Sequence, residues 1–240
     1  MRYISKPQNS EARILLDDAR RTLRALGLTE SYDNFNEYAQ LNNILRREQK
    51  SICCYCQKKI THHNTPNEGG SHNEHFYPER GANARPDLQL DYENLYACCN
   101  TTKDSEEALK HCGWSKHESL IPTNFLRDPS CSSFFLYNTD GEITPTGPYR
   151  RYEDFKRNEN KLTTHQQEIL NAIDILNLNI NSLKEFRRKV IADVHKSMLN
   201  CTKQQLQHRI LTLDNPASGE YAPMIDLVLF FIKKRIASMP

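Results

Sequence analysis

Apolar residues recur at helical spacing near both ends of this 240-residue chain, and the pattern is lost in between. In residues 8–50 the apolar positions lie three or four apart, with an N-terminal cap at Ser10 and a stop at Gly27, which predicts helices. Residues 150–240 return to this pattern and end in "APMIDLVLFFIKKRIA", which predicts a mostly buried helix. Two helical regions therefore frame a central part of different character.

The central part is crowded with cysteine, histidine, glycine and proline. The turn clusters "TPNEGG" and "RGANARPD" interrupt it, and short strands are expected around Cys53 and His75. Farther along, "SSFFLYNTDGEITP" predicts a β-hairpin that turns at its Asp-Gly pair. The sequence thus predicts an α+β fold, mostly α, in four parts: an N-terminal helical segment 1–50, a core 51–120, a loop and hairpin 121–149, and a C-terminal helical region 150–240.

Composition and charge exclude a membrane-spanning protein and say little about partners. No apolar run approaches the roughly 20 residues that cross a bilayer, and the first residues lack the apolar stretch of a signal peptide, so the cytoplasm is the expected compartment and no membrane partner is expected. Residues 150–240 carry 15 Lys and Arg against 10 Asp and Glu, whereas residues 1–149 carry 17 against 20. The basic half indicates a polyanionic partner only weakly, because solvated helix faces explain it equally well.

Six of the eight cysteines fall between residues 53 and 112. In a chain expected in the cytoplasm, such grouping favours a metal site over disulfides. The Cys53-x-x-Cys56 spacing lets two thiolates bind one zinc ion from a tight turn, and Cys99 with Cys112 would complete a closed tetrahedral site. A closed site of four thiolates is structural rather than catalytic, and the alternative is a set of buried thiols without metal.

Two cysteines of these groups are left over. Cys54 and Cys98 are the expected spares, because neighbouring residues on an extended backbone face opposite ways. The zinc ligands expected from the sequence are therefore Cys53, Cys56, Cys99 and Cys112.

Between the two cysteine groups, Glu74 stands next to His75 and is followed by Pro78. In chain order the motifs are C-x-Y-C, E-H-x-x-P, N-L and C-N, with a final Cys. This order resembles the HNH, or ββα-metal, endonuclease family, and most closely the PtuB component of Septu-type and retron-associated anti-phage defence systems. The segments "DGEITP" and "LNLNINSLKEFRRKVI" also resemble that branch. The residues that carry the resemblance are Cys53, Tyr55, Cys56, Glu74, His75, Pro78, Asn94, Leu95, Cys99, Asn100 and Cys112.

The resemblance implies a zinc-stapled ββα-metal core at residues 51–120, embedded between the N-terminal and C-terminal helices. It implies that His75 is the general base, a role suited to an imidazole whose ordinary pKa lies near neutrality. It also implies that Glu74 holds a catalytic Mg²⁺ or Mn²⁺, which prefers oxygen ligands, and that Asn94 shapes the loop that carries the base.

The second ligand of the catalytic cation is less clear, because the sequence departs from the family at the second knuckle. The family has C-x-x-C followed at once by His or Asn, whereas twelve residues separate Cys99 from Cys112 here. The family's ligand lies one or five positions past the final cysteine. If Cys112 is final, these positions are Gly113, which cannot bind, and His117. If Cys99 is final, the first position is Asn100. We favour His117, and Asn100 stays open.

The implied activity is a metal-dependent HNH endonuclease that hydrolyses phosphodiester bonds of DNA, or of RNA such as tRNA. It would be the effector of an anti-phage defence system, with a PtuA-like ATPase subunit as partner and a retron reverse transcriptase–ncRNA complex as a further candidate. One alternative is a zinc-stabilised module that binds nucleic acid or a partner without catalysis, and another is a nuclease acting alone. The Glu74-His75 pair favours an enzyme, because a binding module needs neither side chain.

Overall fold

The computed structural model describes residues 1–62, 69–100 and 105–240. The protein is a mixed α and β protein, and helices, short 3₁₀ turns included, account for close to half of this part of the chain. In chain order the helices and strands are α1 (Glu11–Ala25), α2 (Tyr38–Glu48), β1 (Ser71–His75), β2 (Leu95–Cys99), α3 (Gly113–Lys116), β3 (Phe135–Tyr137), β4 (Ile143–Pro145), α4 (Tyr152–Arg157), α5 (Thr164–Ile175), α6 (Asn181–Ser197), α7 (Lys203–Asp214) and α8 (Ile225–Ala237).

The two sheets of the described chain each consist of two antiparallel strands. Strand β1 pairs with β2, so that Glu74 lies opposite Tyr96, and β3 pairs with β4 across the Asp-Gly turn that the sequence predicted. The expected strand near Cys53 is reduced to one isolated bridge between Ile52 and Lys59. Because a two-stranded sheet is only marginally stable in water, each needs helices against it. Helix α2 contacts both β1 and β2, while α5 and α8 contact the second sheet.

The N-terminal helices form where the apolar pattern predicted them. The Ser10 side chain accepts a hydrogen bond from the backbone N–H of Ala12 and caps α1. The helix ends at Leu26, and Gly27 follows with a φ of 68°, a left-handed conformation that glycine adopts without steric cost. Helix α2 then turns its apolar face toward the first sheet and buries Leu41 and Leu45 completely.

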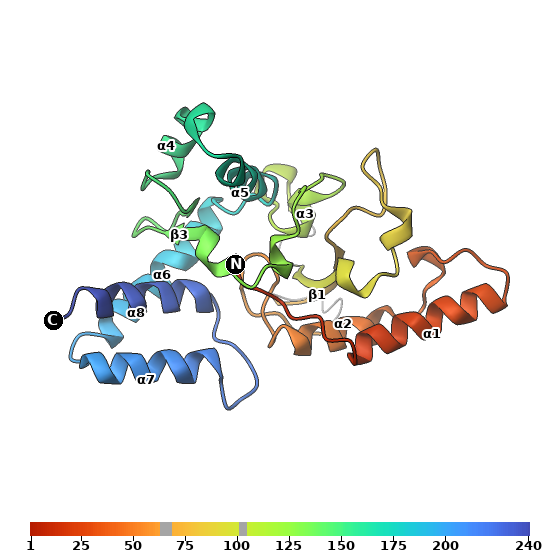
Figure 1. Ribbon diagram of the computed structural model, residues 1–240, viewed down its shortest axis with the longest axis horizontal. Helices are drawn as coiled ribbons and strands as arrows, with labels where there is room; N and C mark the ends of the chain where they lie inside the picture. The colour runs from red at the N-terminus through yellow and green to blue at the C-terminus, as the bar shows by residue number, and fades with distance from the viewer. Residues whose placement is uncertain (63–68, 101–104) are drawn as a thin grey trace.

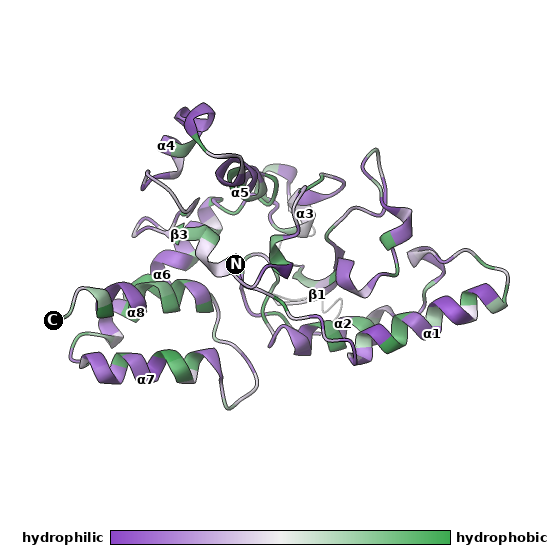
Figure 2. Cartoon of the chain, in the orientation of Figure 1, coloured by the Kyte–Doolittle hydropathy of each residue, from purple (hydrophilic) through white to green (hydrophobic). Residues whose placement is uncertain are grey.

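Figure 1 shows α1 and α2 at one end of the molecule, α7 and α8 at the other, and β1 with α3 between them. Helix α8 is the apolar segment near the chain end, and α6 and α7 pack against it. Its hydrophobic residues are visible as green bands in Figure 2. Helix α7 lies within the region that was predicted to be helical, but its own apolar pattern is weak, because Leu206 is its sole fully buried residue.

One large hydrophobic cluster joins the two ends of the molecule. It includes Leu16 of α1, Leu41 of α2, Phe76 after β1 and Phe231 of α8. Within the described ranges, no helix is both long and apolar enough to cross a bilayer. The first sheet and α3 are therefore positioned from both sides by packed helices.

Arg187 is the largest fully buried side chain of the described part and braces the C-terminal region. From α6 its guanidinium donates to the backbone oxygens of Gly141, in the β3–β4 turn, and of Leu178, both at 2.5 Å. Burial lowers the pKa of Arg187 to about 10, against the opposing influence of Tyr137 and nearby cysteines, so the side chain stays charged at neutral pH. One buried side chain thus donates to two backbone carbonyls.

We expect Arg187→Leu to lower the free energy of unfolding by about 2–4 kcal/mol, because it leaves both carbonyls without a donor. Urea denaturation measures this change. Arg188→Leu is the matched control. Arg188 is half exposed and donates to the Asp140 backbone oxygen, so its loss should lower the free energy of unfolding by less than about 1 kcal/mol. Equal losses for the two variants would contradict the bracing role.

Candidate metal centre and active site

Three separate segments bring sulfur atoms together beside the first sheet. The Sγ of Cys53 lies 3.8 Å from that of Cys98 and 4.0 Å from that of Cys112, and the Sγ atoms of Cys56 and Cys99 are 3.8 Å apart. Four thiolates about 2.3 Å from a tetrahedral zinc ion lie roughly 3.8 Å from one another, so these separations fit a shared ion. We call this set the thiol cluster: Cys53, Cys56, Cys98, Cys99, His111 and Cys112.

The thiol cluster contains every zinc ligand expected from the sequence, together with two more side chains. Cys98 was expected to face away, yet its thiol lies beside Cys53. His111 places its Nδ1 3.1 Å from the Cys112 sulfur. Two groups of four potential ligands result, Cys53, Cys98, Cys99 and Cys112 in one, and Cys56, Cys99, His111 and Cys112 in the other. Neither group is the predicted set, and which four bind an ion stays a prediction.

Local backbone structure explains why these cysteines meet. The Cys53–Cys56 segment is a tight turn, in which Gln57 donates to the Cys53 oxygen and has a φ of 59°. Cys112 also has a positive φ, of 59°, and its N–H donates to the oxygen of Leu176 at the end of α5. Such φ values are strained for non-glycine residues and persist where the surroundings impose them.

The thiols are completely buried, which matters for their ionisation. Burial raises the pKa of Cys56, Cys98 and Cys112 well above the ordinary value. Hydrogen bonds from Cys112 and other thiols lower the pKa of Cys99, and for Cys53 such bonds outweigh the opposing effect of burial. A bound divalent cation would stabilise several thiolates at once, and the donor set of the thiol cluster suits zinc.

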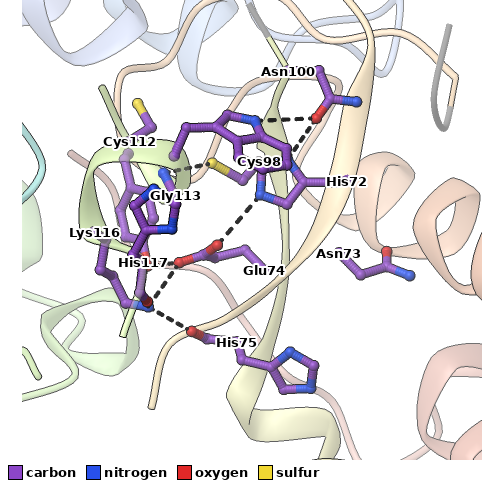
Figure 3. A network of polar contacts seen from close by, with 12 residues as sticks. His72, Asn73, Glu74, His75, Cys98, Asn100, Cys112, Gly113, Lys116 and His117 are labelled. Carbon is purple, nitrogen blue, oxygen red and sulfur yellow. Dashed lines mark hydrogen bonds and ion pairs between the residues drawn. The ribbon is translucent and has the colours of Figure 1, made fainter. Parts of the chain in front are cut away.

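Next to the thiol cluster, β1 presents two faces of different chemistry. His72 and Glu74 point toward α3, while Asn73 and His75 point to the other side (Figure 3). This follows from the two-residue period of a strand. The neighbouring acid and imidazole of the sequence motif therefore lie on opposite faces of one strand.

Glu74 is buried and held by three side chains. Its Oε1 lies 3.0 Å from Lys116 Nζ and accepts a hydrogen bond from the Tyr55 hydroxyl at 3.2 Å. Its Oε2 lies 3.3 Å from Nε2 of His72. Burial opposes ionisation, but Lys116 and His72 outweigh it and lower the pKa of Glu74 to about 2. The acid is thus a carboxylate at any physiological pH.

His75 occupies a defined position on the opposite face. Its ring packs edge-on against Tyr32, with centroids 4.6 Å apart, and its Nε2 donates to the Gln89 backbone oxygen at 2.9 Å. That bond fixes the proton on Nε2 and leaves Nδ1, 3.6 Å from a Glu79 carboxylate oxygen, as the basic nitrogen. Burial lowers the pKa of His75, which keeps the ring neutral at neutral pH.

Asn94 connects the two segments that surround His75. Its side chain donates to the backbone oxygens of Tyr77 and Leu88, both at 3.1 Å, and accepts from the Tyr77 N–H at 2.7 Å. Leu88 precedes Gln89, whose oxygen receives the His75 hydrogen bond. The amide therefore positions the acceptor that orients the imidazole.

The two candidates for the second cation ligand differ in their surroundings. His117 is half exposed, and its Nε2 lies 3.6 Å from a Glu107 oxygen. Asn100, at the end of β2, accepts from His72 Nδ1 at 2.8 Å and from the Trp114 indole at 3.3 Å. The group of three potential ligands around Glu74 consists of His72, Glu74 and Cys98. Nothing in the sequence beyond its proximity to Glu74 pointed to His72, and the structure brings its ring beside the carboxylate.

Comparison with known proteins identifies the family of the chain. No known family profile matches it. A Vibrio cholerae serotype O1 biovar El Tor protein named "Retron Vc95 putative HNH endonuclease" is 32% identical over 176 residues, which cover 70% of this chain and 74% of the relative. The chain belongs to the HNH endonuclease family. The name of this relative supports a nuclease activity. The membership of the HNH family that the sequence motifs predicted is confirmed.

We expect the thiol cluster of this HNH protein to hold one tightly bound metal ion per chain. Cys53→Ser should lower the metal content and the soluble yield, because metal binding and folding are coupled in closed thiolate sites. Cys131→Ser is the matched control, since Cys131 is equally buried but outside the thiol cluster. Elemental analysis by mass spectrometry measures the metal. A wild-type protein that stays folded and metal-free after strong chelation would contradict the expectation.

Proposed function

We propose that this protein is a metal-dependent endonuclease that hydrolyses phosphodiester bonds of DNA or RNA. The observation that carries the proposal is the strand β1, which presents a buried carboxylate, Glu74, on one face and an oriented neutral imidazole, His75, on the other. A protein that only binds nucleic acid has no use for a base held in one tautomer. The family membership supports the same activity.

In this proposal His75 is the general base. Its Nε2 proton is committed to the Gln89 oxygen, so its Nδ1 can accept a proton from the attacking water. Asn94 maintains this geometry by holding Leu88, next to Gln89. Lys116 holds the other side of the strand, because its ammonium contacts both Glu74 and the His75 backbone oxygen.

The proposal includes two metals. Zinc would occupy the thiol cluster and keep the core folded. Glu74 would hold a divalent Mg²⁺ or Mn²⁺, and the family resemblance adds His117 or Asn100 as its second ligand. When bound, that cation supplies charge neutralisation at the scissile phosphate and stabilises the leaving oxygen. The buried, ionised carboxylate with one oxygen turned away from Lys116 fits such a hard cation.

The biological role belongs to the same proposal. A PtuB-like effector of an anti-phage defence system would act in the cytoplasm with a PtuA-like ATPase, or with a retron reverse transcriptase–ncRNA complex. The name of the Vibrio cholerae relative associates that protein with a retron. The near-neutral net charge of this chain argues for a partner that contributes to nucleic-acid affinity, because unaided affinity rests on phosphate contacts by Lys and Arg.

A second function, a zinc-stabilised binding module without catalysis, is favoured by one observation. The first position after Cys112 is Gly113, which has no side chain to bind a cation, and His117 lies beside Glu107 instead. Cleavage assays distinguish the two functions directly.

His75→Ala should reduce the cleavage rate by roughly 100- to 10,000-fold, because it removes the general base. The substrates are supercoiled plasmid and total tRNA, with Mg²⁺ or Mn²⁺, assayed with and without a PtuA-like ATPase. His208→Ala is the matched control, since His208 is exposed on α7, far along the chain from the site. Metal content should be unchanged in both variants. Cleavage by His75→Ala at the wild-type rate would remove His75 from this role, and no cleavage by wild type under any of these conditions would favour the binding module.

A further inference from the structure

We propose that His72 is a ligand of the catalytic cation, in the place that the family gives to a residue of the helix after the knuckle. The inference deepens the proposed function and rests on it. His72 and Glu74 lie two residues apart on one face of β1, with Nε2 and Oε2 3.3 Å apart (Figure 3). Two ligand atoms about 2.1 Å from an octahedral ion, at right angles to each other, lie roughly 3.0 Å apart, so this pair needs only a small adjustment to share an ion.

The hydrogen bonds of the His72 ring determine which nitrogen is available. The Asn100 oxygen accepts from Trp114 Nε1 and lies 2.8 Å from His72 Nδ1. Nδ1 therefore carries a proton, and Nε2 is the nitrogen that faces the Glu74 carboxylate. Without a metal ion, a second proton on Nε2 bridges to Oε2, and a bound cation would take the place of that proton. Two acceptors that face each other repel unless a proton or a metal ion lies between them. A metal-binding histidine usually has its other nitrogen held in this way.

The carboxylate is arranged so that one of its oxygens is available to an ion. Both Lys116 and Tyr55 contact Oε1, and Oε2 faces His72. The thiol of Cys98 is near, but it lies 3.8 Å from Cys53 and accepts from the Gly113 N–H. Soft sulfur suits the zinc of the thiol cluster, whereas nitrogen and oxygen remain for the second ion.

Gly113 explains why the ligand comes from the strand. A Cβ at this position would overlap Glu74 Oε2 and lie 2.8 Å from His72 Nε2. The first residue of α3 thus points directly at the pair, where the family has a ligand one position after the final cysteine. Its φ is not in the left-handed region, so close approach, rather than backbone conformation, requires the glycine. His72 fills the space that a helix side chain would otherwise occupy.

The test is Mn²⁺ binding to zinc-loaded protein, measured by electron paramagnetic resonance without nucleic acid. Mn²⁺ binds more weakly than zinc to a given site and leaves the thiol cluster intact. The wild-type protein should bind one Mn²⁺ ion. It should bind Mn²⁺ more tightly than Mg²⁺, because an imidazole nitrogen is a better ligand for Mn²⁺. His72→Ala and Glu74→Gln should each weaken binding at least about tenfold, with zinc content unchanged. His208→Ala, which removes an exposed histidine of α7 outside the site, is the matched control and should bind like wild type.

If the His72→Ala variant loses zinc, the His72→Gln variant, which keeps more of the side-chain volume, is tested in its place. Wild-type affinity in the His72 variants, or absence of Mn²⁺ binding in wild type, would overturn the inference. If the His72 variants lose Mn²⁺ binding but the wild-type protein cleaves no nucleic acid, His72 is still a ligand of the cation. The proposed nuclease activity is then wrong.

Discussion

The convergence of sulfur atoms from three segments is the constraint on which the centre of this protein depends. Strands β1 and β2 have five residues each and α3 has four, too few to form a stable unit by packing alone. Closing loops of more than forty residues between Cys53 and Cys98 costs chain entropy, which a metal bound in the thiol cluster would offset. The cluster also fixes the start of α3 directly over β1, because Cys112 immediately precedes that helix.

The C-terminal helices contribute to this centre from the outside. The N–H of Cys112 donates to the Leu176 oxygen at the end of α5, and Asn177 donates to the Lys110 oxygen. Arg187 of α6 lies close enough to Cys56 and Cys112 for their charges to influence its pKa. A positive side chain beside negatively charged thiolates is favourable, so Arg187 would stabilise a metal–thiolate site in the thiol cluster electrostatically.

The sequence predicted the helices and the site motif better than it predicted the ligands. The helices α1, α2, α5, α6 and α8 could be read from apolar spacing, since each buries one stripe of side chains. Cys98 and Cys99 were expected to face opposite ways, yet the thiols of both lie in the thiol cluster, at the last two residues of β2. The sequence did not select His72, since only the pairing and face of β1 show that its ring lies 3.3 Å from the Glu74 carboxylate.

The charges around Glu74 connect these features to a phosphodiester substrate. Lys116 neutralises Glu74 through Oε1, so the pair carries no net charge. A divalent cation added at Oε2 makes the same site strongly positive inside a buried setting, where electrostatic interactions are stronger than in water. An anionic phosphate would then be attracted to the face of β1 that carries Glu74 and His72. In the proposed function Lys116 would not compete with the cation, because the two positive groups would contact different oxygens of Glu74.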